Sequence, residues 1–432
     1  MKTKKDKINI ITLGCSKNLV DSEQLMRQLD ANGYGLIHDG ETNSAKIAVI
    51  NTCGFIGDAK EESVNTILQF IEAKKQGKID KVFVMGCLSE RYKKELSEEL
   101  PEADAMFGVN NLEEIVVALG GNFRNELVGE RVLSTPGHYA YLKVSEGCDR
   151  ACSFCAIPLI RGRHISKTEE EIIAEARFLA KKGVKELMLI AQDLTYYGID
   201  IYRKQKLPSL LHKLADIKEL EWIRLHYAYP ASFPKEIARV IKERGNICNY
   251  LDIPFQHISN KVLGKMRRGV DSTQTYELIS FLKEEIPGLV LRSTLMVGHP
   301  GEGEKEFREL KEFVEKARFD RLGVFEYSEE EDTYAANNFR DTVPHKVKQQ
   351  RAGEIMKLQE DISLEKNLEK VGKRIKIIID RNEGNYWIGR SEGDSPEVDN
   401  EVLVSNKYKL EVGKFYDIEI TSADSFDLYA KL

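Results

Sequence analysis

Short apolar runs and amphipathic stretches alternate along the first third of the chain. The apolar runs predict three strands, at residues 8–13, 46–50 and 81–85. Apolar positions three and four residues apart predict helices that begin at Asp21, at about Asp58 and at Ser89. Because strands and helices alternate, we expect an open parallel sheet that helices cover on both faces.

A second alternating series begins at Tyr139, after a glycine-rich and polar stretch at 120–138 that predicts a linker. Its strand candidates are residues 139–145, 186–191, 222–227, 249–255, 289–297 and 321–327. The clearest helix between them opens on a capping box, Thr168 with Glu171, and ends at Gly183. Six β/α units are too few for a closed eight-unit barrel. We therefore expect an open, partial (β/α)6 barrel whose active site lies at the carboxyl ends of the strands.

The pattern changes again near the C-terminal end of the sequence. Pro344 opens a long amphipathic helix that ends near Gly372. Residues 373–432 then contain short alternating runs separated by Gly, Asp, Asn and Ser. Such runs predict a small all-β barrel, so the complete fold class is a multidomain α/β protein with a C-terminal β domain.

Length and composition describe an ordinary soluble protein. The 432 residues suggest two to four domains, and 42% hydrophobic with 31% charged residues provides an ample core. The net charge of −6 argues weakly against a free-standing nucleic-acid binder and permits a basic partner.

The start of the chain has some features of a lipoprotein signal peptide, because basic residues and an apolar run precede Cys15. The apolar run of about six residues is shorter than a real signal core, so we interpret it as the first strand. No apolar run approaches the roughly 18 residues of a membrane span. An odd number of cysteines, seven, fits a reducing cytosol better than a disulfide framework. The sequence therefore predicts a cytoplasmic protein without a membrane anchor.

Three cysteines share one short loop, with the spacing C-x3-C-x2-C. They are Cys148, Cys152 and Cys155, and the loop directly follows the first strand of the second series. Three thiolates can hold three irons of a cubane cluster and leave the fourth iron open to a small molecule. The loop resembles that of the radical S-adenosylmethionine (SAM) enzymes. A zinc site is the alternative, but zinc needs a fourth ligand, and His164 does not have a usual finger spacing.

Three earlier cysteines each follow the end of a predicted strand. Cys15, Cys53 and Cys87 come after the first, second and third strands, and each has a neighbouring glycine. In an open α/β sheet the loops beyond the carboxyl ends converge on one crevice. The repeated placement predicts a second three-thiolate cluster, with glycines that let the backbone approach a bulky inorganic group. Three small buried cysteines are the structural alternative.

Taken together, these features resemble the methylthiotransferases over nearly the whole chain. The resemblance implies an auxiliary-cluster domain at 6–122, a radical SAM domain at 134–364 and an OB-like TRAM domain at 367–432. It also implies two [4Fe–4S] clusters, on Cys15/Cys53/Cys87 and on Cys148/Cys152/Cys155, with SAM as a further cofactor.

Local motifs are most similar to the branch that modifies an aspartate of ribosomal protein S-twelve. The motifs are Leu13–Glu23, Gly147–Arg150, Ala191–Gly198, His226–Pro230 and Tyr250–His257. Two places depart from the family pattern. His299 stands where Phe is usual, and the segment Glu331–Tyr334 replaces a Gly-Thr-Pro turn, which we expect to loosen a loop.

The resemblance implies a reaction at the unactivated β-carbon of the aspartate. One SAM supplies a 5′-deoxyadenosyl radical, a second SAM supplies a methyl group, and the auxiliary cluster carries the sulfur. Candidate SAM contacts are Phe154 in the cysteine loop and, at strand ends, Gln192 and Gly298. Arg161 and Arg163 follow the loop and could hold a carboxylate, although a solvated charge is the simpler expectation.

Charge in the C-terminal domain bears on the partner. From Lys373 to Leu432 there are nine Lys and Arg against twelve Asp and Glu, a net charge of −3. An acidic barrel favours a basic ribosomal protein, free or on the ribosome, and disfavours tRNA. A solvated acidic face without a partner is the alternative. An electron donor is also implied.

Other functions remain open from the sequence. One is a tRNA adenosine methylthiotransferase with the same chemistry, and another is a non-catalytic iron–sulfur carrier. A zinc-structured binding module is the third.

Overall fold

Two units make up the chain in the computed structural model, which describes residues 6–432. The first contains the described residues up to Thr135, together with Tyr141–Asp149 and Ala156–Phe178. The second contains Pro136–Ala140, Arg150–Cys155 and Leu179–Leu432. Most of the basic start of the sequence, residues 1–5, lies outside the described residues. The predicted division into three domains stays a prediction.

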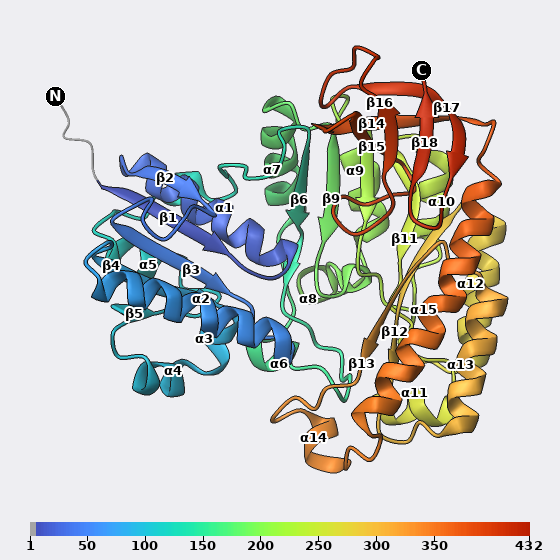
Figure 1. The fold of residues 1–432 in the computed structure, drawn as a ribbon, viewed down its shortest axis with the longest axis horizontal. Coiled ribbons are helices and arrows are strands. Elements are labelled where there is room, and N and C mark those ends of the chain that lie inside the picture. Colours follow the sequence, from blue (N-terminus) through green and yellow to red (C-terminus); the bar gives the residue numbers. More distant parts are fainter. Residues whose placement is uncertain (1–5) are drawn as a thin grey trace. The chain divides into compact units, whose positions relative to one another are not determined.

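A five-stranded parallel sheet forms the centre of the first unit (Figure 1). Its strands, in spatial order, are β2 (Gly35–His38), β1 (Lys7–Thr12), β3 (Ile47–Thr52), β4 (Lys81–Gly86) and β5 (Ala105–Met106). Five helices accompany the sheet: α1 (Ser16–Ala31), α2 (Gly57–Lys75), α3 (Cys87–Arg91), α4 (Lys93–Glu99) and α5 (Leu112–Ala118). Ile50 and Val84 pack with α2 on one face, and Val49 and Phe83 pack with α1 and α5 on the other. The predicted open sheet with two covered faces is confirmed.

Smaller elements complete the first unit. A two-stranded sheet joins β7 (Ser145–Glu146) to β8 (Ile165–Ser166). Helix α6 (Ile157–Ile160) lies between them in sequence, and a 3₁₀ turn, η1 (Asn125–Leu127), lies in the predicted linker. Helix α7 (Glu169–Lys181) runs from the first unit into the second along the chain.

Six strands form the second sheet, as the sequence predicts. Their order is β13 (Arg321–Glu326), β12 (Val290–Val297), β11 (Ile247–Asp252), β10 (Trp222–Leu225), β9 (Glu186–Ile190) and β6 (Tyr139–Lys143). The pairs from β9 to β13 are all parallel. Because β13 and β6 end the series without pairing to each other, the sheet is an open, partial barrel.

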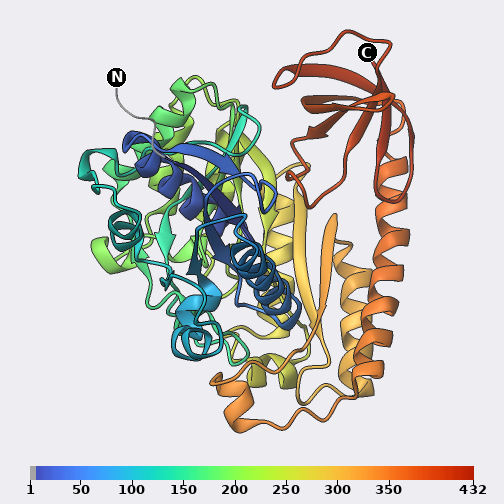
Figure 2. The same cartoon turned by 60° about the vertical axis from the view of Figure 1, so that its left-hand side comes forward.

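Helices follow these strands along the chain. They are η2 (Leu194–Tyr196), α8 (Ile199–Tyr202), α9 (Leu207–Ala215), α10 (Glu236–Glu243), α11 (Asn260–Met266), α12 (Ser272–Glu285), α13 (Glu304–Ala317) and α14 (Tyr334–Asn338). The long helix α15 (His345–Leu368) begins after Pro344, as predicted, and packs against β13 and α13 (Figure 2). None of the helices in residues 6–432 is long and apolar enough to cross a membrane.

A closed five-stranded barrel ends the chain. Its strands follow the order β14 (Arg374–Glu383), β15 (Tyr386–Ser391), β16 (Val402–Ser405), β18 (Leu428–Lys431) and β17 (Phe415–Ala423). Alternate strand residues such as Ile377, Val404 and Ile418 fill its interior. The predicted all-β barrel is confirmed.

Candidate functional site

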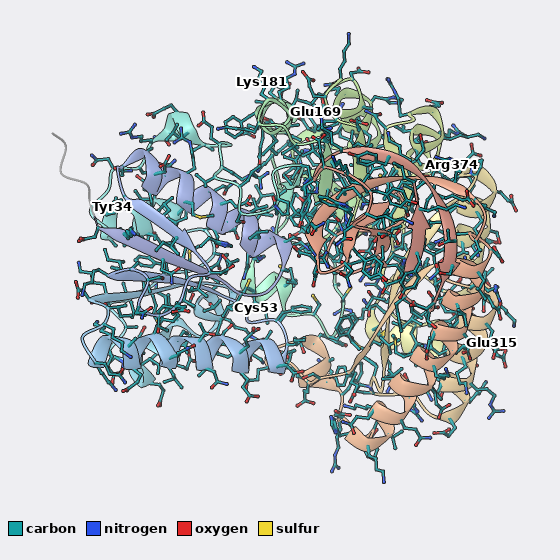
Figure 3. All side chains as sticks on the ribbon, turned by 45° about the horizontal axis from the view of Figure 1, so that its top comes forward. Tyr34, Cys53, Glu169, Lys181, Glu315 and Arg374 are labelled. Atoms are coloured by element: carbon teal, nitrogen blue, oxygen red, sulfur yellow. The ribbon has the colours of Figure 1, made fainter. Side chains whose placement is uncertain are left out.

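Three cysteines lie at the carboxyl ends of neighbouring strands in the first unit. Cys15 is the N-cap of α1, just beyond β1, whereas Cys53 directly follows β3 and Cys87 directly follows β4. Thr52 pairs with Gly86, so Cys53 and Cys87 leave adjacent strands at the same level. Figure 3 labels Cys53 among the surrounding side chains. Cys15 is exposed, Cys53 is half-buried and Cys87 is buried.

Glycines allow the three cysteine loops to pack against one another. Gly14 has a φ of +89°, and a Cβ there would lie 2.7 Å from the Cβ of Cys53. A Cβ on Gly54 would lie 2.9 Å from the carbonyl carbon of Cys87. The sequence suggested that these glycines admit an inorganic group. In the structure they admit the neighbouring loop, which brings the thiols together.

Burial makes two of these three thiols harder to deprotonate. Burial raises the pKa of the Cys87 thiol to about 12, against the opposing effect of Arg161. Burial also raises the pKa of Cys53. Thiolates are therefore disfavoured at neutral pH unless a bound cationic group replaces their protons.

A cluster of irons fits this donor set better than a single ion does. Within residues 6–432, no three His, Cys, Asp or Glu side chains are arranged to hold one metal ion. In an iron–sulfur cluster each thiolate binds a separate iron, so the sulfurs need not converge on one point. Three free thiols from three adjacent strand ends meet that requirement.

Arg161 lies near Cys87, which contacts the same Asn18 oxygen, and its environment corrects a prediction. We expected a solvated charge, but the residue is only 3% exposed. Its guanidinium donates to Asn18 Oδ1 at 2.6 Å, to Glu146 Oε1 at 2.9 Å and to Asp21 Oδ2 at 3.2 Å. Arg161 thus binds carboxylates of its own unit.

The second set of cysteines belongs to the loop after β6. The division between the units falls inside this loop, after Asp149. In the first unit, the Cys148 backbone N–H donates to the carbonyl of Gly162 at 3.1 Å. The His164 backbone N–H donates to Asp149 Oδ1 at 3.1 Å, so the loop start is fixed to the segment after α6.

Two side chains contact Cys152 in the second unit, and the sequence did not reveal either. Arg268 Nη1 donates to Cys152 Sγ at 3.2 Å, and Tyr229 Oη lies 3.5 Å from the same sulfur. Arg268 also donates to the Pro254 carbonyl and stacks its guanidinium on the Tyr229 ring, 4.3 Å from the ring centroid. Because Arg268 is 5% exposed, its positive charge is buried against this cysteine.

The candidate SAM contacts lie in two places within the second unit. Phe154 is half-buried and meets His299 edge to face, with ring centroids 6.3 Å apart. Gly298 precedes His299 at the end of β12, and Lys348 packs over it, so a Cβ there would lie 2.8 Å from Lys348 Cδ. Gln192 follows β9, with β10 and β11 between it and β12 in the sheet. The structure brings Phe154 close to the β12 end, and SAM contact by all three stays a prediction.

The two departures from the family pattern have structural explanations. Burial lowers the pKa of His299 to about 4, so a neutral ring packs against Phe154 and Tyr327 as a phenyl group would. The second departure was expected to loosen a loop, and this stays a prediction, although the segment has contacts at its end. Thr333 caps α14 through Ala336, and the Ala335 N–H donates to the Ser153 carbonyl at 2.7 Å.

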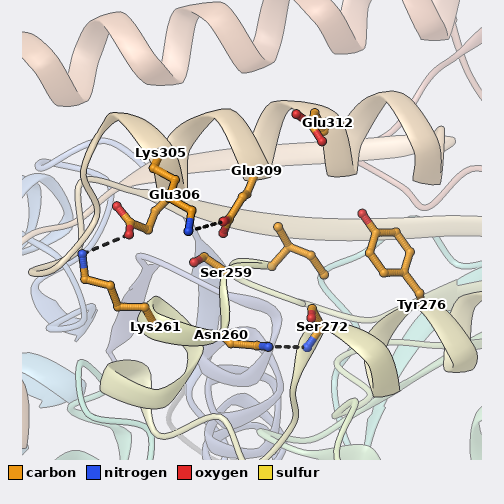
Figure 4. A pocket seen from close by; sticks show the side chains of 10 residues that line it. Ser259, Asn260, Lys261, Ser272, Tyr276, Lys305, Glu306, Glu309 and Glu312 are labelled. Atoms are coloured by element: carbon orange, nitrogen blue, oxygen red, sulfur yellow. Dashed lines mark hydrogen bonds and ion pairs between the residues drawn. The ribbon is translucent and has the colours of Figure 1, made fainter.

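A polar pocket of about 450 Å³ lies among α11, α12 and α13 (Figure 4). Two ion pairs lie among the residues that line the pocket: Lys261 with Glu306, at 3.0 Å, and Lys305 with Glu309, at 3.9 Å. None of the predicted site residues is among the residues that line it.

Three family models match successive parts of the chain. One, described as an uncharacterized protein family, UPF0004, matches residues 7–108. The radical SAM superfamily matches residues 142–314, and a TRAM domain matches residues 371–432.

Solved structures share the fold at low sequence identity. The radical SAM methyltransferase TsrM from Kitasatospora setae is 13% identical, with a TM-score of 0.56, over 76% of this chain and 77% of that one. The cobalamin-dependent radical SAM enzyme OxsB is 13% identical, with a TM-score of 0.52, over 82% of this chain and 56% of that one.

Much closer relatives cover the chain from end to end. A protein of Phocaeicola vulgatus named ribosomal protein uS12 methylthiotransferase RimO is 59% identical, over 99% of this chain and 100% of its own. A protein of the same name from Bacteroides thetaiotaomicron is 60% identical, over 99% of both chains. With this identity and coverage, the chain belongs to the RimO family of radical SAM methylthiotransferases.

Proposed function

We propose that this enzyme attaches a methylthio group to the β-carbon of an aspartate in ribosomal protein uS12, also called S-twelve. The observation that carries the proposal is the presence of two separate three-cysteine sets in a chain of the RimO family. One set lies at the strand ends of the first sheet, and the other lies on the loop after β6. A single set would explain radical formation but would leave the sulfur without a binding site.

The cofactors of this family, [4Fe–4S] clusters and SAM, supply a radical that can remove hydrogen from an unactivated carbon. We assign Cys148, Cys152 and Cys155 to the SAM-cleaving cluster and Cys15, Cys53 and Cys87 to the auxiliary cluster. One SAM then serves as the radical source and a second as the methyl donor. Phe154, Gln192 and Gly298 are assigned to SAM contact. We assign the auxiliary cluster to a domain of residues 6–122 and SAM cleavage to a domain of residues 134–364. Residues 367–432 form the TRAM domain in this assignment.

The chain's own residues prepare both sites for these groups. The Cys152 sulfur accepts a hydrogen bond from Arg268, which fixes the position of this side chain. At the end of β12, Lys348 packs over Gly298, and the neighbouring His299 is buried.

The main alternative substrate is a tRNA adenosine, and the charges of the C-terminal barrel bear on this alternative. The C-terminal barrel has a net charge of −3, yet eight of its Lys and Arg are exposed against five of its Asp and Glu. Six further carboxylates of the barrel are half-buried, so its fully exposed charges are less acidic than the net charge, and tRNA is offered beside uS12 in the test. We place the protein in the cytoplasm, with an electron donor as a further partner.

Anaerobic reconstitution, followed by iron counting and product analysis, tests the proposal. We expect about eight irons in the wild type and about four in Cys15→Ala/Cys53→Ala/Cys87→Ala. The triple variant should still form 5′-deoxyadenosine but should not modify its substrate. Purified uS12, free or within ribosomal subunits, and bulk tRNA are offered in parallel, and mass spectrometry detects the methylthio group.

Each outcome separates two functions. Four irons in both proteins would make the N-terminal cysteines structural and would remove the sulfur-carrying role. Modified tRNA with unmodified uS12 would replace the proposed substrate. Full iron without SAM cleavage would indicate an iron–sulfur carrier.

A further inference from the structure

We propose that Arg161 is a positioning residue for the auxiliary site, where it supplies the positive charge that stabilises a buried, negatively charged iron–sulfur group. The inference rests on the proposed function, because it requires that Cys15, Cys53 and Cys87 hold such a group. It concerns a residue that neither cysteine motif contains.

Arg161 reaches the Cys87 thiol through a short hydrogen-bonded chain. Its Nη2 donates to Asn18 Oδ1 at 2.6 Å, and Cys87 Sγ lies 3.5 Å from the same oxygen. Asn18 is fully buried, and its amide nitrogen donates to the carbonyls of Leu13 and Thr52, which fixes the orientation of its oxygen. The guanidinium is therefore held at a set position next to Cys87.

Arg161 and Lys143 share the carboxylates of Asp21 and Glu146. Arg161 also bonds to the Asn18 oxygen that Cys87 contacts. A cluster on three thiolates is an anion, and a buried anion is costly unless a counter-charge lies close to it.

Arg161 also connects the auxiliary site to the other cysteine loop within the first unit. It pairs with Glu146, the last residue of β7, and Cys148 follows two positions later. Its pairs with Asp21 and Glu146 therefore join α1, which Cys15 caps, to the start of that loop. One side chain thus contributes both the charge at the first site and the placement of the second loop.

The test isolates the auxiliary group and measures its reduction. In the Cys148→Ala/Cys152→Ala/Cys155→Ala protein only the N-terminal set can hold iron. A potentiometric titration with dithionite, read by electron paramagnetic resonance, gives the midpoint potential of the one-electron reduction. We expect Arg161→Gln to lower the equilibrium constant for reduction at least tenfold, which is about 59 mV toward negative potential. Arg161→Lys keeps the charge and should recover most of the shift.

Two further variants serve as controls. Arg163→Gln removes an exposed arginine two residues away and should leave the midpoint unchanged. Arg161→Gln removes one of the two cations that pair with Asp21 and Glu146 and leaves Lys143 as the other, so the variant could unfold the unit. Arg161→Gln/Glu146→Gln keeps the Lys143–Asp21 pair intact, and we expect the same negative shift, whereas Glu146→Gln alone should cause none.

The outcomes distinguish this inference from the proposed function. An unchanged midpoint in both Arg161→Gln proteins, with about four irons bound, would overturn the role of Arg161 alone. Failure of the parent protein to bind iron would instead overturn the auxiliary cluster itself.

Discussion

At the scale of single residues, Arg268 and Tyr229 give Cys152 an environment that differs from that of an ordinary buried thiol. Arg268 donates to the sulfur at 3.2 Å, and the Tyr229 hydroxyl, which donates to the Arg268 carbonyl, keeps the two side chains together. Hydrogen bonds to cluster sulfurs stabilise the reduced cluster, and partners of metal ligands tune both affinity and activity. If Cys152 holds the proposed SAM-cleaving cluster, Arg268 should assist the reduction of that cluster.

We predict that Arg268→Gln slows reductive SAM cleavage by roughly 10–100-fold while the protein still binds iron at Cys148, Cys152 and Cys155. The charge and the hydrogen bond to sulfur are lost, so the reduced cluster is less stable. Formation of 5′-deoxyadenosine at fixed dithionite concentration measures the effect. Arg267→Gln is the matched control, because Arg267 is the exposed neighbour. Equal rates in the two variants would contradict the prediction.

The sequence predicts the cysteine positions well and their partners poorly. A thiol just beyond a parallel strand must lie at the carboxyl edge of the sheet, so strand prediction alone places Cys53 and Cys87. The contacts of Arg161 with Asn18 and of Arg268 with Cys152 join residues 143 and 116 positions apart. No local pattern encodes such pairs, because they depend on which helices and loops pack together.

At the scale of elements, helix α7 shows a predicted feature that the structure confirms. The Thr168 backbone N–H donates to Glu171 Oε2 at 2.7 Å, and the Glu171 N–H donates to Thr168 Oγ1 at 3.2 Å. These reciprocal bonds satisfy donors at the helix start that would otherwise need water.

Thr168→Ala should destabilise the start of α7 by about 1 kcal/mol, since the capping hydroxyl is lost. Amide hydrogen exchange in the first turn of α7 measures this loss as faster exchange. Thr66→Ala in α2 is a suitable control. The Thr66 hydroxyl bonds only to the Glu62 carbonyl, one turn earlier in its own helix, and we expect a change within about 0.5 kcal/mol. Similar effects at both positions would show that the capping box adds nothing.

Element boundaries were predicted less well than element types. Helix α1 begins at Ser16, five residues before the predicted start, because Asn18 and Val20 are buried and continue the helix toward Cys15. The strands β2 and β5 were not predicted. They are the edge strands of the sheet, four and two residues long, and such short segments carry too few alternating positions to be recognised.

At the scale of the whole molecule, the net charge of the C-terminal barrel does not describe its surface alone. Several of its charges are buried in ion pairs within the second unit. Arg390 pairs with Glu186 of β9 at 2.8 Å and with Asp380 of its own barrel at 2.6 Å. Asp394 pairs with Arg321 of β13. A net charge counts these residues equally with exposed ones, so it describes the barrel's contacts with the six-stranded sheet as much as its surface.

These buried carboxylates predict how the stability of the second unit depends on pH. Burial alone would raise the pKa of Glu186, but Arg390 and Arg224 outweigh it and hold the pKa below its ordinary value. The pKa values of Asp380 and Asp394 are lowered in the same way, burial being outweighed by His138 and Arg390 for the first and by Arg321 and Lys370 for the second. The unfolded chain, with ordinary pKa values of about 4, then binds more protons than the folded chain in acid.

His299, whose folded pKa of about 4 lies below the ordinary value of about 6.5, already lowers stability as the pH falls from about 6.5 to 4. We therefore expect a gradual loss of stability in that range and a further loss below about pH 4, where the unfolded chain binds carboxylate protons that the folded chain excludes. Trp222 reports on the contact, because its ring meets Phe415 of the barrel edge to face at 4.8 Å. Urea unfolding of a Trp387→Phe protein, followed by the fluorescence of Trp222, gives the midpoint at each pH.

Glu186→Gln should lower the urea midpoint at pH 7 and flatten its further loss in acid. Glu411→Gln, which changes an exposed carboxylate of the same barrel, should follow the parent curve. If Glu186→Gln also followed that curve, the buried ion pairs would contribute no net stability, and the attachment of the barrel would depend on apolar contacts such as Trp222 with Phe415.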